Sequence, residues 1–99
     1  MALKTRKFDP AAYLDDSEAL AEYMADALEP GDVACIADAI GVIARTRGMS
    51  TIARETGLSR ESLYRALSPE GNPELSTLIK VLDSLGLHLT AVPNQKGSG

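Results

Sequence analysis

Two short segments that flank Gly57 restrict most strongly how this chain can fold. Residues 50–67 read STIARETGLSRESLYRAL, and Ala53 lies four residues before the glycine. Two helices that cross steeply over a tight turn need a small residue where their backbones approach and a residue that tolerates positive φ at the turn. The segment therefore predicts a helix over 50–56, a left-handed C-cap at Gly57, and a second helix over 60–67.

Polar and apolar side chains of the second predicted helix separate onto two faces. The apolar side chains expected to pack the two helices together are Ile52, Leu58, Leu63 and Ala66. The side chains left facing solvent are Arg60, Glu61, Ser62, Tyr64 and Arg65. A recognition helix presents such a hydrogen-bonding surface to base edges in the major groove of DNA, so a helix-turn-helix is the favoured interpretation. The alternative is an ordinary helical hairpin with solvated charges.

Specific chemistry can be assigned to this exposed face. Arg60 and Arg65 can each make bidentate contacts to guanine, and Glu61 can accept a hydrogen bond from cytosine. Ser59 is expected to cap the second helix, and together with that helix N-terminus it suits a backbone phosphate. The face is therefore predicted to read bases, with its N-terminal end on the phosphate backbone.

Charge is segregated along the chain, although the formal net charge is −4. Residues 9–38 hold no Lys or Arg, and their acidic residues are Asp9, Asp15, Asp16, Glu18, Glu22, Asp26, Glu29, Asp32 and Asp38. Residues 39–68 carry Arg45, Arg47, Arg54, Arg60 and Arg65 against Glu55 and Glu61. Because screening confines each patch to roughly 10 Å, an acidic protein can bind DNA through one basic face. We therefore expect one acidic and one basic face; a mixed, solvated surface is the alternative.

Capping and stop residues mark the other helices. The predicted elements are a short turn over 10–14 after Asp9, a helix over 17–28 capped by Ser17, a helix over 33–47 capped by Asp32 and stopped by Gly48, and a helix over 74–85 stopped by Gly86. Apolar steps of three and four predict the buried faces to be Leu20, Tyr23, Met24, Ala27 and Leu28, then Val33, Ile36, Ala37, Ile40, Ile43 and Ala44, then Leu75, Leu78, Ile79, Leu82 and Leu85. We expect Cys35 to be a small packed side chain rather than a reactive thiol.

The alternation LHLTAV over residues 87–92 predicts one short strand after the last helix. A single strand needs a partner for its backbone donors and acceptors. The favoured partner is the same strand of a second copy, which would form a two-fold dimer through Leu87, Leu89 and Ala91. The N-terminal arm and a binding partner are the alternatives. The domain interpretation is a flexible basic arm over 1–8, docked by Phe8, one domain over 9–93, and a disordered tail over 94–99.

Several protein classes are excluded by composition. The chain has no run of eighteen apolar residues and no apolar segment behind its basic N-terminus, so neither a membrane span nor a signal peptide is expected. One cysteine excludes an internal disulfide and fits the cytoplasm. One histidine, His88, with no phosphate loop and no metal-ligand spacing, argues against an enzyme, a cofactor or a metal site. We expect a non-enzymatic binding protein.

The chain resembles a known family at the stretches LSRESLYRALSPEGNP, LSTLIKVLDSLGL and FDPAAYLDD. Between about Phe8 and Pro93 it is similar to addiction-module antidote proteins related to HigA antitoxins, which carry a Cro/cI-type, lambda-repressor-like helix-turn-helix. The resemblance implies an all-α, five-helix DNA-binding domain with an N-terminal helical extension, beside the short C-terminal strand predicted above.

The resemblance also implies partners and site residues. It implies a homodimer that represses its own operon by binding operator DNA and that neutralises a RelE/HigB-like toxin. Base contacts would fall on Arg60, Glu61 and Arg65, and phosphate contacts on Ser50, Thr51, Ser59 and Asn72. The first helix of the pair is shorter than usual in the wider fold, which counts against base contacts from Thr51. A basic toxin would meet the acidic side of 9–38, at Glu18, Glu22 and Asp26. A stand-alone repressor and a toxin-binding module without DNA binding are the alternatives.

Overall fold

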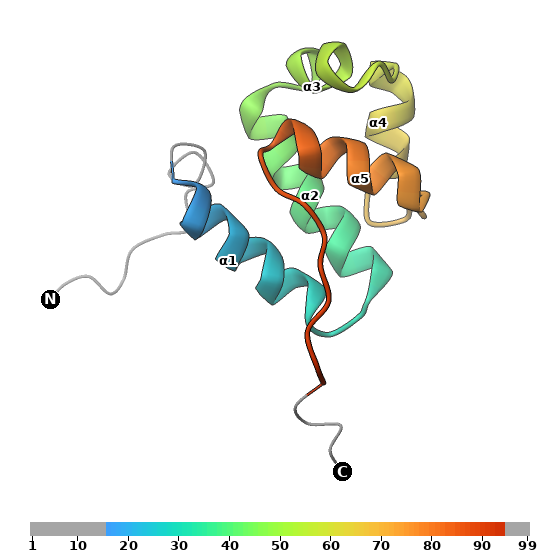
Figure 1. The fold of residues 1–99 in the computed structure, drawn as a ribbon. Coiled ribbons are helices and arrows are strands. Elements are labelled where there is room, and N and C mark those ends of the chain that lie inside the picture. Colours follow the sequence, from blue (N-terminus) through green and yellow to red (C-terminus); the bar gives the residue numbers. More distant parts are fainter. Residues whose placement is uncertain (1–15, 95–99) are drawn as a thin grey trace, which may run out of the picture.

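A computed structural model of the protein describes residues 16–94, which form five helices and no strand. The helices are α1 (Ser17–Leu28), α2 (Val33–Arg47), α3 (Met49–Thr56), α4 (Arg60–Ala66) and α5 (Leu75–Ser84). Figure 1 shows α2 running through the middle of the molecule, with α1 joined to its lower end and α3 to its upper end. The predicted all-α fold class is confirmed, and each predicted helix in this part of the chain is present with bounds within one residue at either end.

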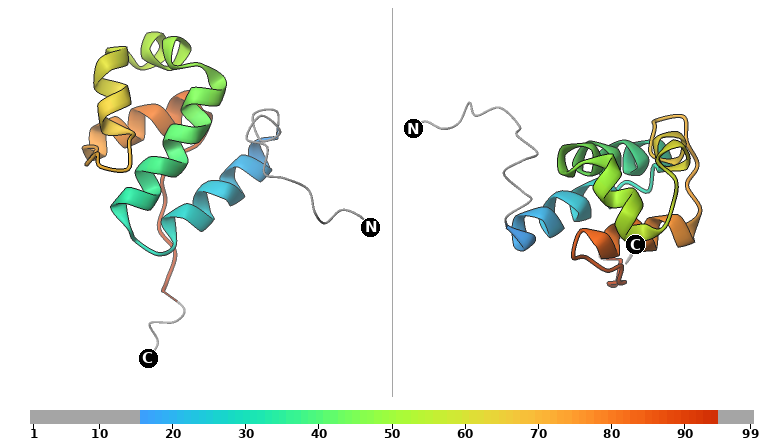
Figure 2. Two further views of the ribbon diagram at one scale, coloured as in Figure 1. Left: turned by 180° about the vertical axis from the view of Figure 1, so that it is seen from behind. Right: turned by 90° about the horizontal axis from the view of Figure 1, so that it is seen from above.

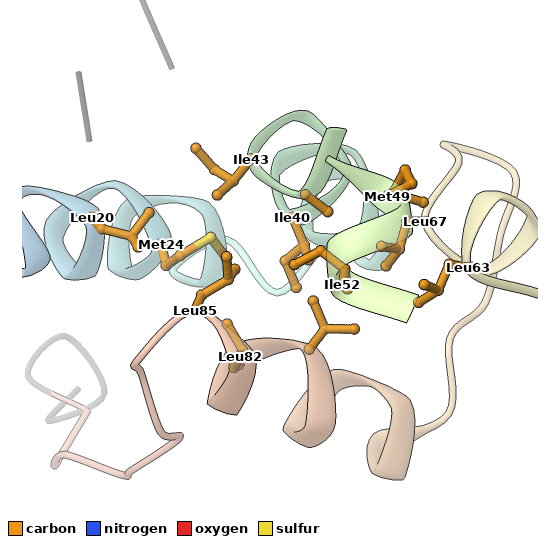
Figure 3. Close-up of a cluster of buried hydrophobic side chains, with 12 residues drawn as sticks. Leu20, Met24, Ile40, Ile43, Met49, Ile52, Leu63, Leu67, Leu82 and Leu85 are labelled. Atoms are coloured by element: carbon orange, nitrogen blue, oxygen red, sulfur yellow. The ribbon is translucent and has the colours of Figure 1, made fainter. Parts of the chain in front are cut away.

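The hydrophobic core takes side chains from all five helices, with α1 and α3 packed on α2 and with α4 and α5 packed on α3. Aliphatic side chains dominate it, and its larger members are Leu20, Met24, Ile40, Ile43, Met49, Ile52, Leu63, Leu67, Val81, Leu82 and Leu85. In Figure 3, Ile40 of α2 and Ile52 of α3 lie at the centre, with Leu63 and Leu67 reaching in from the α4 side. Burying one such side chain stabilises the fold by roughly 1.5–3 kcal/mol, so this cluster determines how the short helices are oriented.

Aspartates cap the first two helices. The Asp16 carboxylate accepts hydrogen bonds from the backbone N–H groups of Glu18 and Ala19, each at 3.1 Å. The predicted cap at Ser17 is therefore wrong by one residue, because Ser17 is already helical and Asp16 holds the extended conformation that a cap requires. The predicted cap at Asp32 is confirmed by its hydrogen bond from the Ala34 N–H, at 3.0 Å.

Gly57 ends α3 in the left-handed conformation, as predicted. Its φ is 79° and its ψ is 9°, and its N–H donates to the Ala53 carbonyl at 2.9 Å. Non-glycine residues rarely occupy this region because Cβ approaches the backbone. The chain can thus reverse within three residues and start α4 at a steep angle to α3 (Figure 1).

Gly41 lies where α2 and the end of α4 come close together. A Cβ atom built on Gly41 would collide with the Leu67 backbone carbonyl and lie 2.9 Å from the Arg45 guanidinium. This contact was not predicted from the sequence. A glycine in the middle of a helix is the signal that could have found it, since it costs helix stability unless another backbone approaches.

The buried face of α5 is rotated relative to the prediction. Leu75 and Ile79 are 63% and 49% exposed, so their predicted burial is wrong, whereas Val81 is fully buried. The helix packs instead through Leu78, Val81 and Leu82, followed by Leu85 at its C-cap, because those side chains join the core and α5 lies against α3. The packing predicted for Val33 and Cys35 is also wrong, since both are exposed at the start of α2.

The predicted strand over 87–92 is wrong. The chain beyond α5 continues without strand pairing, because no other extended segment lies beside it within residues 16–94. Of the three residues expected to form a dimer strand, Leu87 packs against the core, while Leu89 and Ala91 are exposed. Leu87 is held by its own N–H, which donates to the Leu82 carbonyl at 2.9 Å.

Other predictions fall on residues that the structure does not describe. They are the basic arm over 1–8 with its docking residue Phe8, the turn over 10–14, and the tail beyond Asn94. Among residues 16–94, no helix is both long and apolar enough to cross a membrane.

Replacement of Gly41 by Ala tests the close approach of α2 and α4. At an unobstructed position inside a helix, Ala favours folding by up to about 1 kcal/mol. Here we expect the free energy of unfolding to fall by about 1–3 kcal/mol, because the methyl group meets a backbone carbonyl. Urea denaturation measures the change, with Cys35→Ala on the exposed side of the same helix as a near-neutral control. A Gly41→Ala variant at least as stable as wild type would contradict the contact.

Replacement of Gly57 by Ala tests the left-handed cap separately from packing. Nothing lies within 4 Å of a Cβ atom at this position, so any loss reports backbone conformation alone. We expect Gly57→Ala to lower the free energy of unfolding by roughly 1–2 kcal/mol. Gly57→Asn should lose less, because Asn tolerates this conformation. Equal losses for the two variants, measured by thermal unfolding, would argue against the cap.

Candidate functional site

The outer face of α4 carries the five side chains predicted to contact bases. Arg60, Glu61, Ser62, Tyr64 and Arg65 are all exposed. Leu63, between them in sequence, is fully buried and anchors the helix to the core. α4 lies at the edge of the molecule, with α3 beside its N-terminal end (Figure 1). The structure thus brings the predicted residues together on one accessible surface; their contacts with bases remain predictions.

Tyr64 holds the Arg60 side chain over its ring. The guanidinium carbon lies 5.8 Å from the ring centroid, within the range of a cation–π contact. The two residues are four apart, so they lie on the same side of α4. Sequence reasoning did not predict this contact, although the i, i+4 spacing of an arginine and a tyrosine is its signal. Both residues are exposed, so the contact lies on the outer face of α4.

The N-terminal end of α4 is closed by Ser59. Its hydroxyl oxygen accepts from the Ser62 N–H at 3.0 Å, and the same hydroxyl donates to the Ser62 side-chain oxygen at 2.9 Å. The predicted cap is confirmed. Both serines are exposed, so the end of the helix is open to solvent.

The other residues predicted to contact phosphate lie apart from this cap. Ser50 is exposed and Thr51 half-buried in the first turn of α3, which begins at Met49 without a side-chain cap. The first N–H groups of a helix have no acceptor within it, so this turn presents donors. Asn72 is exposed in the loop between α4 and α5.

Arginines dominate the charge around α3 and α4. In the part of the chain that the structure describes, Arg47 forms an ion pair with Glu55, with 3.3 Å between the guanidinium nitrogen and the carboxylate oxygen. This pair neutralises one of the two acidic side chains in residues 39–68. Arg45, Arg54, Arg60 and Arg65 are also exposed, against Glu61 in the same stretch, so the surface formed by residues 39–68 carries more positive than negative charge.

The acidic residues of α1 lie away from α4. Glu18, Glu22 and Asp26 follow one another at intervals of four along α1, and all three are exposed. Figures 1 and 2 show α1 on the opposite side of α2 from α4. Within residues 16–94, the acidic α1 and the arginine-bearing α4 are therefore separated by α2, and the prediction of one acidic and one basic face stays a prediction for the surface as a whole.

A cleft that sequence reasoning missed runs beside α1. Its volume is about 440 Å³, and one wall is α1 while the other is the chain that follows α5. Most of its lining is apolar, with Glu29 and His88 as its titratable side chains. The only hint in the sequence was the apolar alternation over 87–92.

No group of His, Cys, Asp and Glu side chains suited to a metal ion occurs within residues 16–94.

Comparison with known proteins relates this chain to a described protein family. Residues 4–93 match the family model described as probable addiction module antidote protein. A protein of Haemophilus influenzae, described only as uncharacterized, is 42% identical over 87 residues, which cover 88% of this chain and 90% of that protein. No solved structure matches. Because the family model spans nearly the whole chain, including the basic α3–α4 end and the acidic α1, this chain belongs to the probable addiction module antidote proteins.

Proposed function

We propose that this protein is the antitoxin of a type II toxin–antitoxin pair and represses its own operon by binding operator DNA. Membership of the antidote family supports a toxin partner. The observation that carries the DNA-binding part is the exposed face of α4, where Arg60, Glu61 and Arg65 point away from the core. The protein acts by binding alone, as a non-enzymatic protein of the cytoplasm.

DNA binding would use α3 and α4 as a helix-turn-helix of the Cro/cI type. α4 enters the major groove, where Arg60 and Arg65 reach guanine edges and Glu61 reaches cytosine. Ser50, Thr51, Ser59 and Asn72 meet the phosphate backbone on either side of the groove. The contact with Tyr64 orders Arg60 before DNA arrives, which lowers the entropy lost on binding.

Repression would use a homodimer. A recognition helix as short as α4 reads only a few base pairs, so affinity for one operator requires two copies on half-sites about one helical turn apart. The exposed Leu75 and Ile79 of α5 leave apolar surface available for association. The measured mass in solution at working concentration is the direct test of this state.

Toxin neutralisation would use the acidic side of α1. A RelE/HigB-like toxin cleaves RNA and must present basic side chains to hold it, so Glu18, Glu22 and Asp26 offer complementary charge. Because α1 and α4 lie on opposite sides of α2, the protein can hold toxin and DNA at the same time (Figure 2).

The assignment of α4 to the groove is tested by titrating variants against the DNA upstream of the chain's own gene. We expect Arg60→Ala and Arg65→Ala each to reduce discrimination between operator and altered sequence by about 1–3 kcal/mol, because a bidentate base contact is lost. Ser50→Ala should weaken binding to all sequences alike, since phosphate carries no sequence information. Lys80→Ala, on α5, removes a charge outside the helix pair and serves as control. Unchanged sequence preference in both arginine variants would refute the assignment.

The acidic surface is tested by co-purification with the protein encoded by the adjacent reading frame. We expect the double variant Glu18→Lys, Glu22→Lys to bind that protein at least about tenfold more weakly, because like charges then face each other. Operator affinity should not fall, since α1 lies away from α4. Glu70→Lys with Glu74→Lys, which changes net charge equally beyond α4, is the matched control. Equal weakening by both pairs would indicate a long-range charge effect instead of a contact.

A further inference from the structure

The cleft beside α1 is an apolar groove, with a helix as one wall and the chain that follows α5 as the other. Ala21, Ala25 and Leu28 form the α1 wall, and Leu87, Leu89 and Val92 line the opposite side. Leu89 and Val92 are 37% and 79% exposed, so this apolar surface is open to solvent in the isolated chain. Residues 21 to 28 of α1 border the groove over roughly 10 Å, about two helical turns.

The groove continues into an acidic hollow at the N-terminal half of α1. Asp16, Glu18, Ala19, Ala21 and Glu22 line that hollow, so Ala21 belongs to both surfaces. Glu29 adds a carboxylate at the far end of the groove. Among the described residues, the ion pair joins Arg47 and Glu55, and none of the carboxylates around the groove takes part in it. The apolar groove therefore lies beside a row of carboxylates that no described cation neutralises.

This combination selects for one kind of partner surface. Ala21 and Ala25 are small and four residues apart, so a second helix can pack closely against α1 at this point. Apolar side chains of that helix would fill the groove, and Lys or Arg side chains on its flank would reach Glu18, Glu22 and Glu29. A second copy of this chain fits poorly, because its described arginines gather at the α3–α4 end and are assigned to DNA.

We propose that the toxin partner docks a basic amphipathic helix in the groove between α1 and residues 87–92. This inference rests on the proposed antitoxin function and adds the position and chemistry of the toxin contact. Residues 87–92, which were predicted to form a strand, would then serve as the second wall of a binding groove. Burial of Leu89 and Val92 by the toxin would remove their apolar surface from water.

Groove-filling variants of the full-length chain test the proposal by calorimetric titration with the protein encoded by the adjacent reading frame. Both Ala21 and Ala25 are exposed, so Ala21→Gln with Ala25→Gln leaves the core and the net charge unchanged. We expect this double variant to bind the toxin at least about tenfold more weakly, because polar side chains then occupy the apolar wall. Ala34→Gln, at an exposed alanine on α2 outside the groove lining, should bind within about twofold of wild type. Operator affinity should be the same for all these proteins.

Each other outcome overturns the proposal in a recognisable way. Unchanged toxin affinity with a lower Tm would indicate that the chain's own residues 1–15 cover the groove. Unchanged toxin affinity with loss of a dimer would indicate a second copy. If Glu18→Lys with Glu22→Lys weakens the complex and the groove variant does not, the groove inference fails while the antitoxin function stands. If the wild-type chain binds no adjacent gene product, the toxin role and the groove fail together.

Discussion

The packing of α3 and α4 against α2 determines what every other part of the molecule can do. Ile40 and Ile52 meet at the centre of the core, and Leu63 reaches it from α4. Because α4 has only seven residues, a single buried leucine in its middle is enough to set its rotation. The close approach at Gly41 then places the end of α4 directly on α2. Arg60 and Arg65 face solvent as a consequence of this packing, not through any interaction of their own.

Separation of charge is the second organising property. The helix α1, which carries exposed acidic side chains, and the helix α4, which carries Arg60 and Arg65, lie on opposite sides of α2 (Figure 2). Screening limits each patch to roughly 10 Å, so the net charge of −4 does not describe either surface. Two oppositely charged surfaces on one small chain suit a protein that binds one polyanion and one basic protein, which is the function proposed above.

The segment after α5 illustrates how a correct pattern can lead to a wrong element. Residues 87–92 alternate apolar and polar side chains, and the alternation does describe how Leu87 turns inward. A strand, however, is defined by hydrogen bonds to a neighbour, and residues 16–94 supply no extended neighbour. The same side chains instead form one wall of the cleft beside α1.

Local chemistry in the sequence determined the helices, the capping residues Asp32 and Ser59, the reversal at Gly57 and the exposed face of α4, because each depends on residues within one or two turns. Only the tertiary structure decided which side of α5 is buried, since Leu75 and Ile79 fit the apolar period as well as Val81 but lie on the side of α5 that the core does not cover. It also decided the approach at Gly41 and the groove beside α1. Those features join residues far apart in the chain, and helical periodicity carries no information about such distances.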